Sequence, residues 1–111
     1  MQSINIGALI SQMQNAASAV IGKDVTALEG FSAQQMKQIG QQAVLVANGI
    51  ADGSITGDTR DFLLQSLKEM VGSFVNTLAG LVVVTIEETV NAIVKVLWDA
   101  IGKAAGVALH V

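Results

Sequence analysis

Apolar residues recur every three or four positions along most of this 111-residue chain, and this spacing determines the expected fold class. Residues three or four apart lie on one face of an α-helix, so each such run predicts a helix with one buried face. The sequence has no proline and eleven glycines, a pattern typical of helices that end at glycine turns. We therefore expect an all-α fold, a single domain over residues 1–111 built as a small bundle of three to four helices.

The first two expected helices have regular apolar faces and few charges. The first covers about residues 4–21 and ends before Gly22, and the second covers about residues 32–51 with Ser32 as its N-cap. Both faces have the spacing of a coiled-coil seam. They consist of Ile6, Ile10, Met13, Ala17 and Val20 in the first helix, and of Met36, Ile39, Ala43, Val46 and Ile50 in the second.

A third apolar run extends over about residues 59–102. It predicts either one long C-terminal helix, with Asp58 as its cap, or a closely packed helix pair broken near Ala79–Gly80. A turn is usually more polar than this segment, so we favour a continuous or merely kinked helix. A β-strand over residues 81–86 is a weaker alternative, which rests only on the β-branched residues there.

Charged residues are scarce and unevenly distributed. They make up 14% of the chain, against about 25% in average globular proteins, and ten of the fifteen lie after residue 57. The outer faces of the first two helices must therefore consist of Gln, Ser, Asn and Ala, which tolerate burial against another helix better than Lys or Glu do. The sequence predicts more apolar surface than one copy can bury, and hence a homo-oligomer held by apolar helical faces.

The expected interface combines a glutamine patch with apolar residues of the second half. Glutamine side chains can hydrogen-bond to their own kind across a symmetric interface without charge repulsion, although a solvated face is an equally weighted alternative. Trp98, the single tryptophan, is expected to anchor a core or an interface. The expected interface residues are Gln34, Gln38, Gln41, Gln42, Phe74, Leu78, Val82, Val83 and Trp98.

The uncharged stretch over residues 70–86 supports a competing interpretation. It is 17 residues long and diluted by polar side chains, whereas a bilayer span needs about 20 apolar residues, so we favour a central core helix. Gly72 with Gly80, and the GxxxG motif Gly102–Gly106, are spacings that also suit helix packing in a membrane. The alternative function is therefore a membrane-active helical protein, either pore-forming or a phage-type lysis or ejection accessory.

No motif for catalysis or ligand binding can be assembled. The loop over residues 52–58 imitates the start of an EF-hand, but Leu63 stands where the bidentate glutamate should be, so a capped turn is favoured. Glu87 and Glu88 point about 100° apart on a helix, and His110, the single histidine, has no second ligand nearby. Without cysteine there is no thiolate chemistry. We expect a non-enzymatic protein without metal, cofactor or small-molecule substrate.

Charge also limits the expected partners and location. The net charge is −3, and the six basic residues are dispersed, which disfavours nucleic-acid binding. The first basic residue is Lys23, so the start of the sequence lacks the charged region of a secretory signal. We expect a cytoplasmic or virion-associated assembly protein whose partner is itself, with a membrane as the alternative partner.

Overall fold

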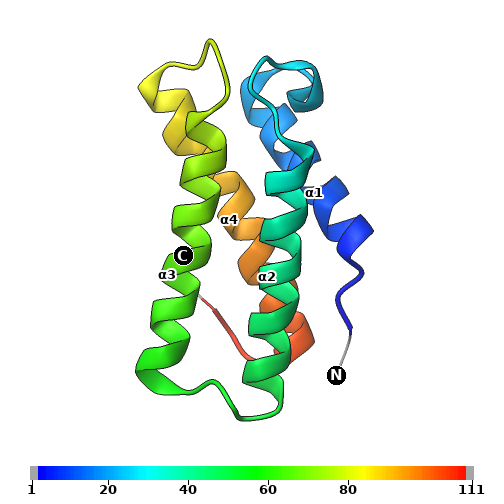
Figure 1. Cartoon of the computed structure of the whole chain (residues 1–111), viewed down its shortest axis with the longest axis vertical. Coiled ribbons are helices and arrows are strands. Elements are labelled where there is room, and N and C mark those ends of the chain that lie inside the picture. Colours follow the sequence, from blue (N-terminus) through cyan, green and yellow to red (C-terminus); the bar gives the residue numbers. More distant parts are fainter. Residues whose placement is uncertain (1–2, 110–111) are drawn as a thin grey trace.

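The computed structural model describes residues 3–109, and His110 lies outside the described residues. Within them the chain forms four α-helices and one short 3-10 helix, without strands: α1 (Ile6–Ile21), η1 (Val25–Ala27), α2 (Ala33–Ala51), α3 (Gly57–Asn76) and α4 (Val83–Ala105). The helices run alternately up and down a long axis of 41 Å (Figure 1). The turns α1–α2 and α3–α4 lie together at one end, which we call the apex. The expectation of an all-α bundle is confirmed.

Local capping determines where α1 and α2 begin and end. The Asn5 side-chain oxygen accepts a hydrogen bond from the Ala8 N–H at 2.9 Å, and the Ser32 hydroxyl oxygen accepts one from the Gln35 N–H at 3.1 Å. Gly22 ends α1 in the left-handed conformation, with φ of 81°. These ends lie within two residues of those expected from the sequence, because the capping residues act locally.

Helix α4 is the centre of the bundle, since it packs against all three other helices. Its buried residues are Thr89, Ile93, Val94, Leu97, Trp98, Ile101, Gly102 and Ala104. Thr89 is the one buried polar residue among these, and its hydroxyl donates to the Thr85 carbonyl at 2.7 Å. The core therefore forms around α4. The one hydroxyl buried on this helix, that of Thr89, has a hydrogen-bond partner.

The region expected as one helix over residues 59–102 is divided into two helices, which corrects the continuous helix that we favour from the sequence. Helix α3 ends at Asn76 and α4 begins at Val83. Between them Gly80 has a φ of 83°, a left-handed conformation that a continuous right-handed helix does not contain. The arrangement is the alternative, a closely packed pair broken near Ala79–Gly80, and residues 83–86 are helical rather than a strand.

An apolar turn is possible here because a distant loop satisfies its backbone groups. The Ala79 N–H donates to the Glu29 carbonyl at 2.9 Å. The Thr77 hydroxyl lies 2.6 Å from the Phe74 carbonyl oxygen and 3.1 Å from the Gly30 carbonyl oxygen, so its single proton is shared between the two. A Cβ atom on Gly30 would overlap the Thr77 carbonyl oxygen. We call this contact between Glu29–Gly30 and Thr77–Ala79 the apical clasp. The hydrogen bonds from Ala79 and Thr77 to this distant loop take the place of contacts that a solvated turn would make with water.

The connection between α2 and α3 is a capped turn. The Asp52 carboxylate accepts from the Ser54 N–H at 2.9 Å, and the Ser54 hydroxyl donates to the Gly49 carbonyl at 3.3 Å. Helix α3 begins at Gly57, two residues earlier than expected, and Asp58 lies in its first turn rather than at the cap. Asp52 and Ser54, two of the oxygen-bearing side chains that imitate an EF-hand, are thus engaged with the backbone of their own turn.

Candidate interaction surface

Three of the expected interface residues belong to the core of the bundle. Phe74, Leu78 and Trp98 are buried, and the Phe74 ring meets the Phe31 ring edge-on, with centroids 5.8 Å apart. Phe74 and Leu78 are inaccessible to a second chain while the bundle is intact, which corrects their placement at an interface. Trp98 lies in the core, which is one of the two positions expected for it. The physical reason is the central position of α4, which draws the apolar faces of the other helices onto itself. A single copy therefore buries part of the apolar surface that the sequence assigned to contacts between copies.

Val82 and Val83 lie on the surface at the apex. Together with Val84 they are 67%, 69% and 62% exposed, in chain order. They form the start of α4, directly after the turn of the apical clasp. We call Val82–Val84 the valine run. It lies on α4, whereas the glutamine patch lies on α2 and begins in the first turn of that helix, at the same end of the bundle.

The glutamine patch lies on the outer face of α2. Gln34, Gln38 and Gln41 are exposed, whereas Gln42 is half-buried. Gln35 is half-buried as well, and its side-chain oxygen is buried without a hydrogen-bond partner. Three of the four expected glutamines are thus available to a partner.

Leu45 and Phe62 are the surface candidates that sequence reasoning missed. They are 64% and 70% exposed and lie on α2 and α3, which pack against each other. Leu45 lies six residues before the end of α2, and Phe62 five residues after the start of α3, so both stand about 8–9 Å from the connecting turn at 1.5 Å per residue. Their exposure could have been predicted from the sequence, because neither residue belongs to the apolar stripe of its helix.

These two residues are the apolar centre of a largely neutral surface, which we call the α2–α3 face. Large exposed apolar side chains surrounded by polar ones are a common mark of an interaction site. Its members are all exposed and consist of Gln34, Lys37, Gln38, Gln41, Leu45 and Asn48 from α2, and Asp58, Phe62, Gln65, Glu69 and Ser73 from α3.

The seam between α2 and α3 holds a shallow groove of about 160 Å³. It is lined by Gln35, Gln38, Ile39, Met70 and Ser73. Ligand pockets usually measure about 300–1,000 Å³, so this groove is too small for an organic ligand. A nearly flat face with an apolar centre is typical of protein–protein contacts.

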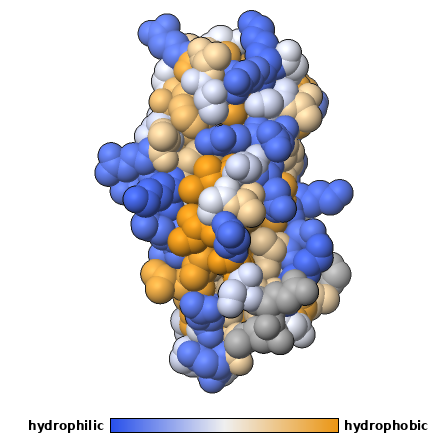
Figure 2. All heavy atoms as spheres, turned by 90° about the vertical axis from the view of Figure 1, so that its right-hand side faces the viewer, coloured by the Kyte–Doolittle hydropathy of each residue, from blue (hydrophilic) through white to orange (hydrophobic). Residues whose placement is uncertain are grey.

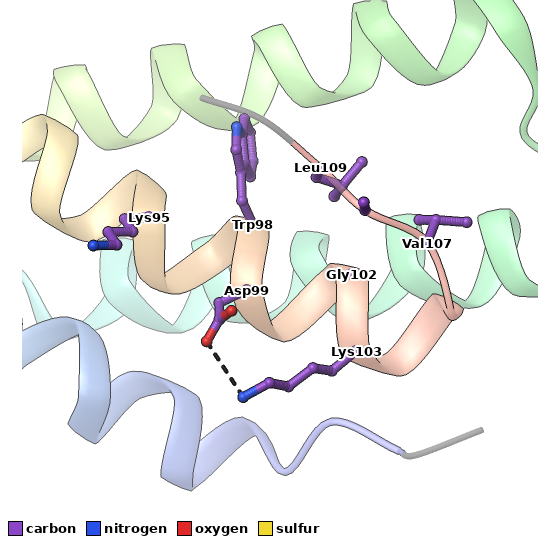
Figure 3. A pocket seen from close by; sticks show the side chains of 8 residues that line it. Lys95, Trp98, Asp99, Gly102, Lys103, Val107 and Leu109 are labelled. Carbon is purple, nitrogen blue, oxygen red and sulfur yellow. Dashed lines mark ion pairs between the residues drawn. The ribbon is translucent and has the colours of Figure 1, made fainter.

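A larger groove, of about 530 Å³, lies between α4 and the tail that follows it (Figure 3). Figure 3 shows the Trp98 indole pointing toward the tail, whereas Asp99 and Lys103 point to the other side of α4. Asp99 and Lys103 form the one ion pair within residues 3–109, at 3.4 Å between exposed side chains. In a ligand site, polar groups converge on an apolar wall. In this groove Asp99 and Lys103 point away from the wall that contains Trp98.

The glycines that suggested helix packing have local roles instead. Gly106 caps α4 with a φ of 73°, and the Val107 N–H donates to the Gly102 carbonyl at 3.0 Å. A Cβ atom on Gly102 would lie 2.8 Å from the Val107 carbonyl oxygen, so this glycine admits the chain's own tail. Gly80 lies in a turn, and a Cβ atom on Gly72 would meet no atom within 4 Å.

Two exposed carboxyl groups have lowered pKa values because they cap turns. The Thr26 hydroxyl and backbone N–H donate to the Asp24 carboxylate at 2.7 and 3.0 Å, which lowers the pKa of Asp24. Ser54 lowers the pKa of Asp52 in the same way. Both groups belong to turns, so their electrostatics serve the fold rather than the α2–α3 face.

Helix α1 presents a second neutral surface. Its 16 residues contain no charged side chain. Figure 2, which views the side of the bundle on which α1 lies, shows apolar surface in the middle of that face with hydrophilic side chains around it. The large apolar residues of α1 are at most half-exposed, so this surface offers weaker anchors than Leu45 and Phe62.

Comparison with known proteins gives no further guide, since no family model, curated protein or solved structure matches the chain.

The stretch over residues 70–86 is divided between α3, the apical turn and α4. Across the described range, none of the helices combines the length and apolar character required to cross a membrane. Residues 3–109 also hold no cluster of three or more His, Cys, Asp or Glu that could bind a metal ion.

Proposed function

We propose that this chain is a non-enzymatic structural protein that assembles with copies of itself through the α2–α3 face. One observation carries the proposal: Leu45 and Phe62 stand at the same height on adjacent helices, and both are largely exposed. Aromatic and aliphatic side chains at the centre of a polar rim are the residues that usually dominate the free energy of association.

Charge and height favour a second copy as the partner. A twofold axis parallel to the helices places α2 of one copy across α3 of the other, as in an isologous dimer. Leu45 then faces Phe62 of the second copy. Lys37 lies about 12 Å from Leu45 along α2 and Glu69 about 10.5 Å from Phe62 along α3, both toward the apex. Each lysine is therefore placed opposite a glutamate of the second copy.

The same arrangement pairs the neutral side chains. Gln41 and Gln65 lie at similar heights, so each amide faces an amide that can both donate and accept. The face measures roughly 28 Å by 20 Å, from helix length and width. Its accessible area is comparable with the roughly 800 Å² per partner of a standard interface.

The test is the molar mass of the full chain in solution, measured by size-exclusion chromatography with light scattering. We expect a dimer or larger oligomer for the wild type. Phe62→Glu places a charge at the apolar centre and should raise the dissociation constant at least 30-fold, since a central anchor contributes at least about 2 kcal/mol. Gln12→Glu, on the exposed face of α1, is the matched control and should leave the mass unchanged.

A charge exchange tests the orientation of the two copies. Lys37→Glu should weaken association because like charges then face each other, and adding Glu69→Lys should restore it. A wild type that remains a monomer at every concentration contradicts the proposal. So does a Phe62→Glu variant with unchanged mass and a native circular-dichroism spectrum.

A further inference from the structure

The valine run at the apex is a second, independent surface. Its three side chains are each more than 60% exposed, yet valine is among the residues most often buried. The run lies between Leu81 and Thr85–Ile86, all half-buried, so residues 81–86 read Leu-Val-Val-Val-Thr-Ile. This segment contains no charge, proline or glycine, and five of its six residues are β-branched. That composition favours a strand over a helix.

The start of α4 is also weakly fixed as a helix. Val82 occupies the N-cap position, and no side chain accepts a hydrogen bond from the first N–H groups of α4. In α1 and α2, by contrast, Asn5 and Ser32 supply such a bond. The backbone at Val82 is already extended, with φ −84° and ψ 162°. Like the start of α3, the first turn of α4 therefore opens without the loss of a side-chain cap.

The area of the valine run distinguishes between rigid docking and strand pairing. Three valines offer at most a few hundred Å², well below the roughly 800 Å² per partner of a stable interface. Docking of the intact apex on a protein would therefore be weak. Opening of the first turn adds unpaired backbone N–H and C=O groups, which a neighbouring strand can satisfy.

We propose that residues 81–86 are a self-recognition segment, which pairs as a β-strand with the same segment of a second copy when the first turn of α4 opens. In a strand, Val82, Val84 and Ile86 lie on one face, a continuous β-branched surface suited to a dry contact. Identical segments stacked in register bring like residues together, and no charge within the segment opposes this. Glu87 marks its end, because stacked carboxylates repel.

The test uses the full chain, incubated with agitation in urea just below its unfolding transition. Thioflavin T fluorescence gives the lag time, and infrared absorption with fibre diffraction near the strand spacing of about 4.7 Å gives the structure. Val83→Glu places an acid in the first turn of α4, where a helix tolerates it well, but the charge repels itself in a stack. Val83→Thr keeps β-branching without charge and is the matched control.

We expect β-rich assemblies from the wild type and from Val83→Thr with similar lag times, and a lag at least tenfold longer for Val83→Glu. Urea unfolding followed in parallel should show Val83→Glu to be no less stable than the wild type. Phe62→Glu acts on the α2–α3 face and should still form the β-assembly. Failure of either proposal is thus separable from failure of the other.

Three results overturn the inference. The first is a Val83→Glu lag equal to that of the wild type. The second is a protease-resistant core of the assembly that lacks residues 81–86 by mass spectrometry. The third is the absence of β-assembly together with Val83-dependent binding of the native protein to phosphatidylcholine vesicles, which would assign the valine run to a lipid surface instead.

Discussion

Replacing Gly30 with alanine tests whether the apical clasp stabilises the bundle. Gly30 has a φ of 91°, and an added Cβ atom would overlap the Thr77 carbonyl oxygen. Gly80→Ala is the matched control, because Gly80 has a φ of 83° and no atom within 4 Å of an added Cβ. The two variants carry the same backbone penalty, and only the first also carries the steric conflict with the other loop.

The structure allows the two free-energy changes to be estimated separately. Forcing alanine into the left-handed region costs about 1–2 kcal/mol, which is the expected loss for Gly80→Ala. In Gly30→Ala the loops must also separate, so the bond from Ala79 to Glu29 and the bond from Thr77 to Gly30 are lost or lengthened. The Thr77 hydroxyl keeps its shorter bond to the Phe74 carbonyl, so the main loss is the Ala79 bond. At about 1 kcal/mol for this bond, the expected loss for Gly30→Ala is about 2–3 kcal/mol.

The assay is urea unfolding followed by the fluorescence of Trp98, the single tryptophan, which is buried in the core. Linear extrapolation gives the free energy of unfolding of each variant. We expect Gly30→Ala to be less stable than Gly80→Ala by about 1 kcal/mol, from the loss of the Ala79 bond. Equal losses would refute this expectation, since the contact between the loops would then contribute nothing beyond backbone conformation.

Three further changes probe other parts of the fold. Phe74→Ala should lower the free energy of unfolding by about 3–5 kcal/mol in the same assay, because a fully buried ring leaves a cavity. Val82→Ser supplies the missing N-cap of α4 and should raise it by about 1 kcal/mol, and a loss would show that Val82 contributes more by packing than a cap would. The pKa of Asp24 lies below its ordinary value of 3.8, so its ionised form stabilises the folded state above that pH. This contribution is lost as the pH falls through the lowered pKa. Asp24→Asn should therefore unfold with a shallower dependence on pH below 3.8, and an unchanged acid transition would contradict the role of the Thr26 hydrogen bonds.

The sequence predicts α1 and α2 well because the interactions that define them are local. Helical spacing, Ser32 and Gly22 act within a few residues, so they can be recognised without knowledge of the tertiary structure. The break at Gly80 could not be predicted in the same way. Its turn is apolar because its backbone bonds to Glu29, about fifty residues earlier, and no local pattern shows that partner.

The candidate surface was predicted only in part, for a related reason. Phe74 and Leu78, which the sequence placed at an interface, lie on the apolar helical stripes and are buried in the core. Exposed anchors are found among apolar residues that depart from the stripe, as Leu45 and Phe62 do. The glutamines on the outer face of α2 could be predicted from the sequence, because an uncharged helix face can be recognised there directly.

The central position of α4 has a consequence for synthesis of the protein in the cell. A chain is made from its N-terminus, and domains fold as units, so α1, α2 and α3 leave the ribosome before the helix that they all pack against. Their apolar faces stay exposed until residues 83–105 have emerged. The valine run emerges first among these residues, before the rest of its own helix exists. During this interval the apolar faces that α4 later covers are open to contact with other chains.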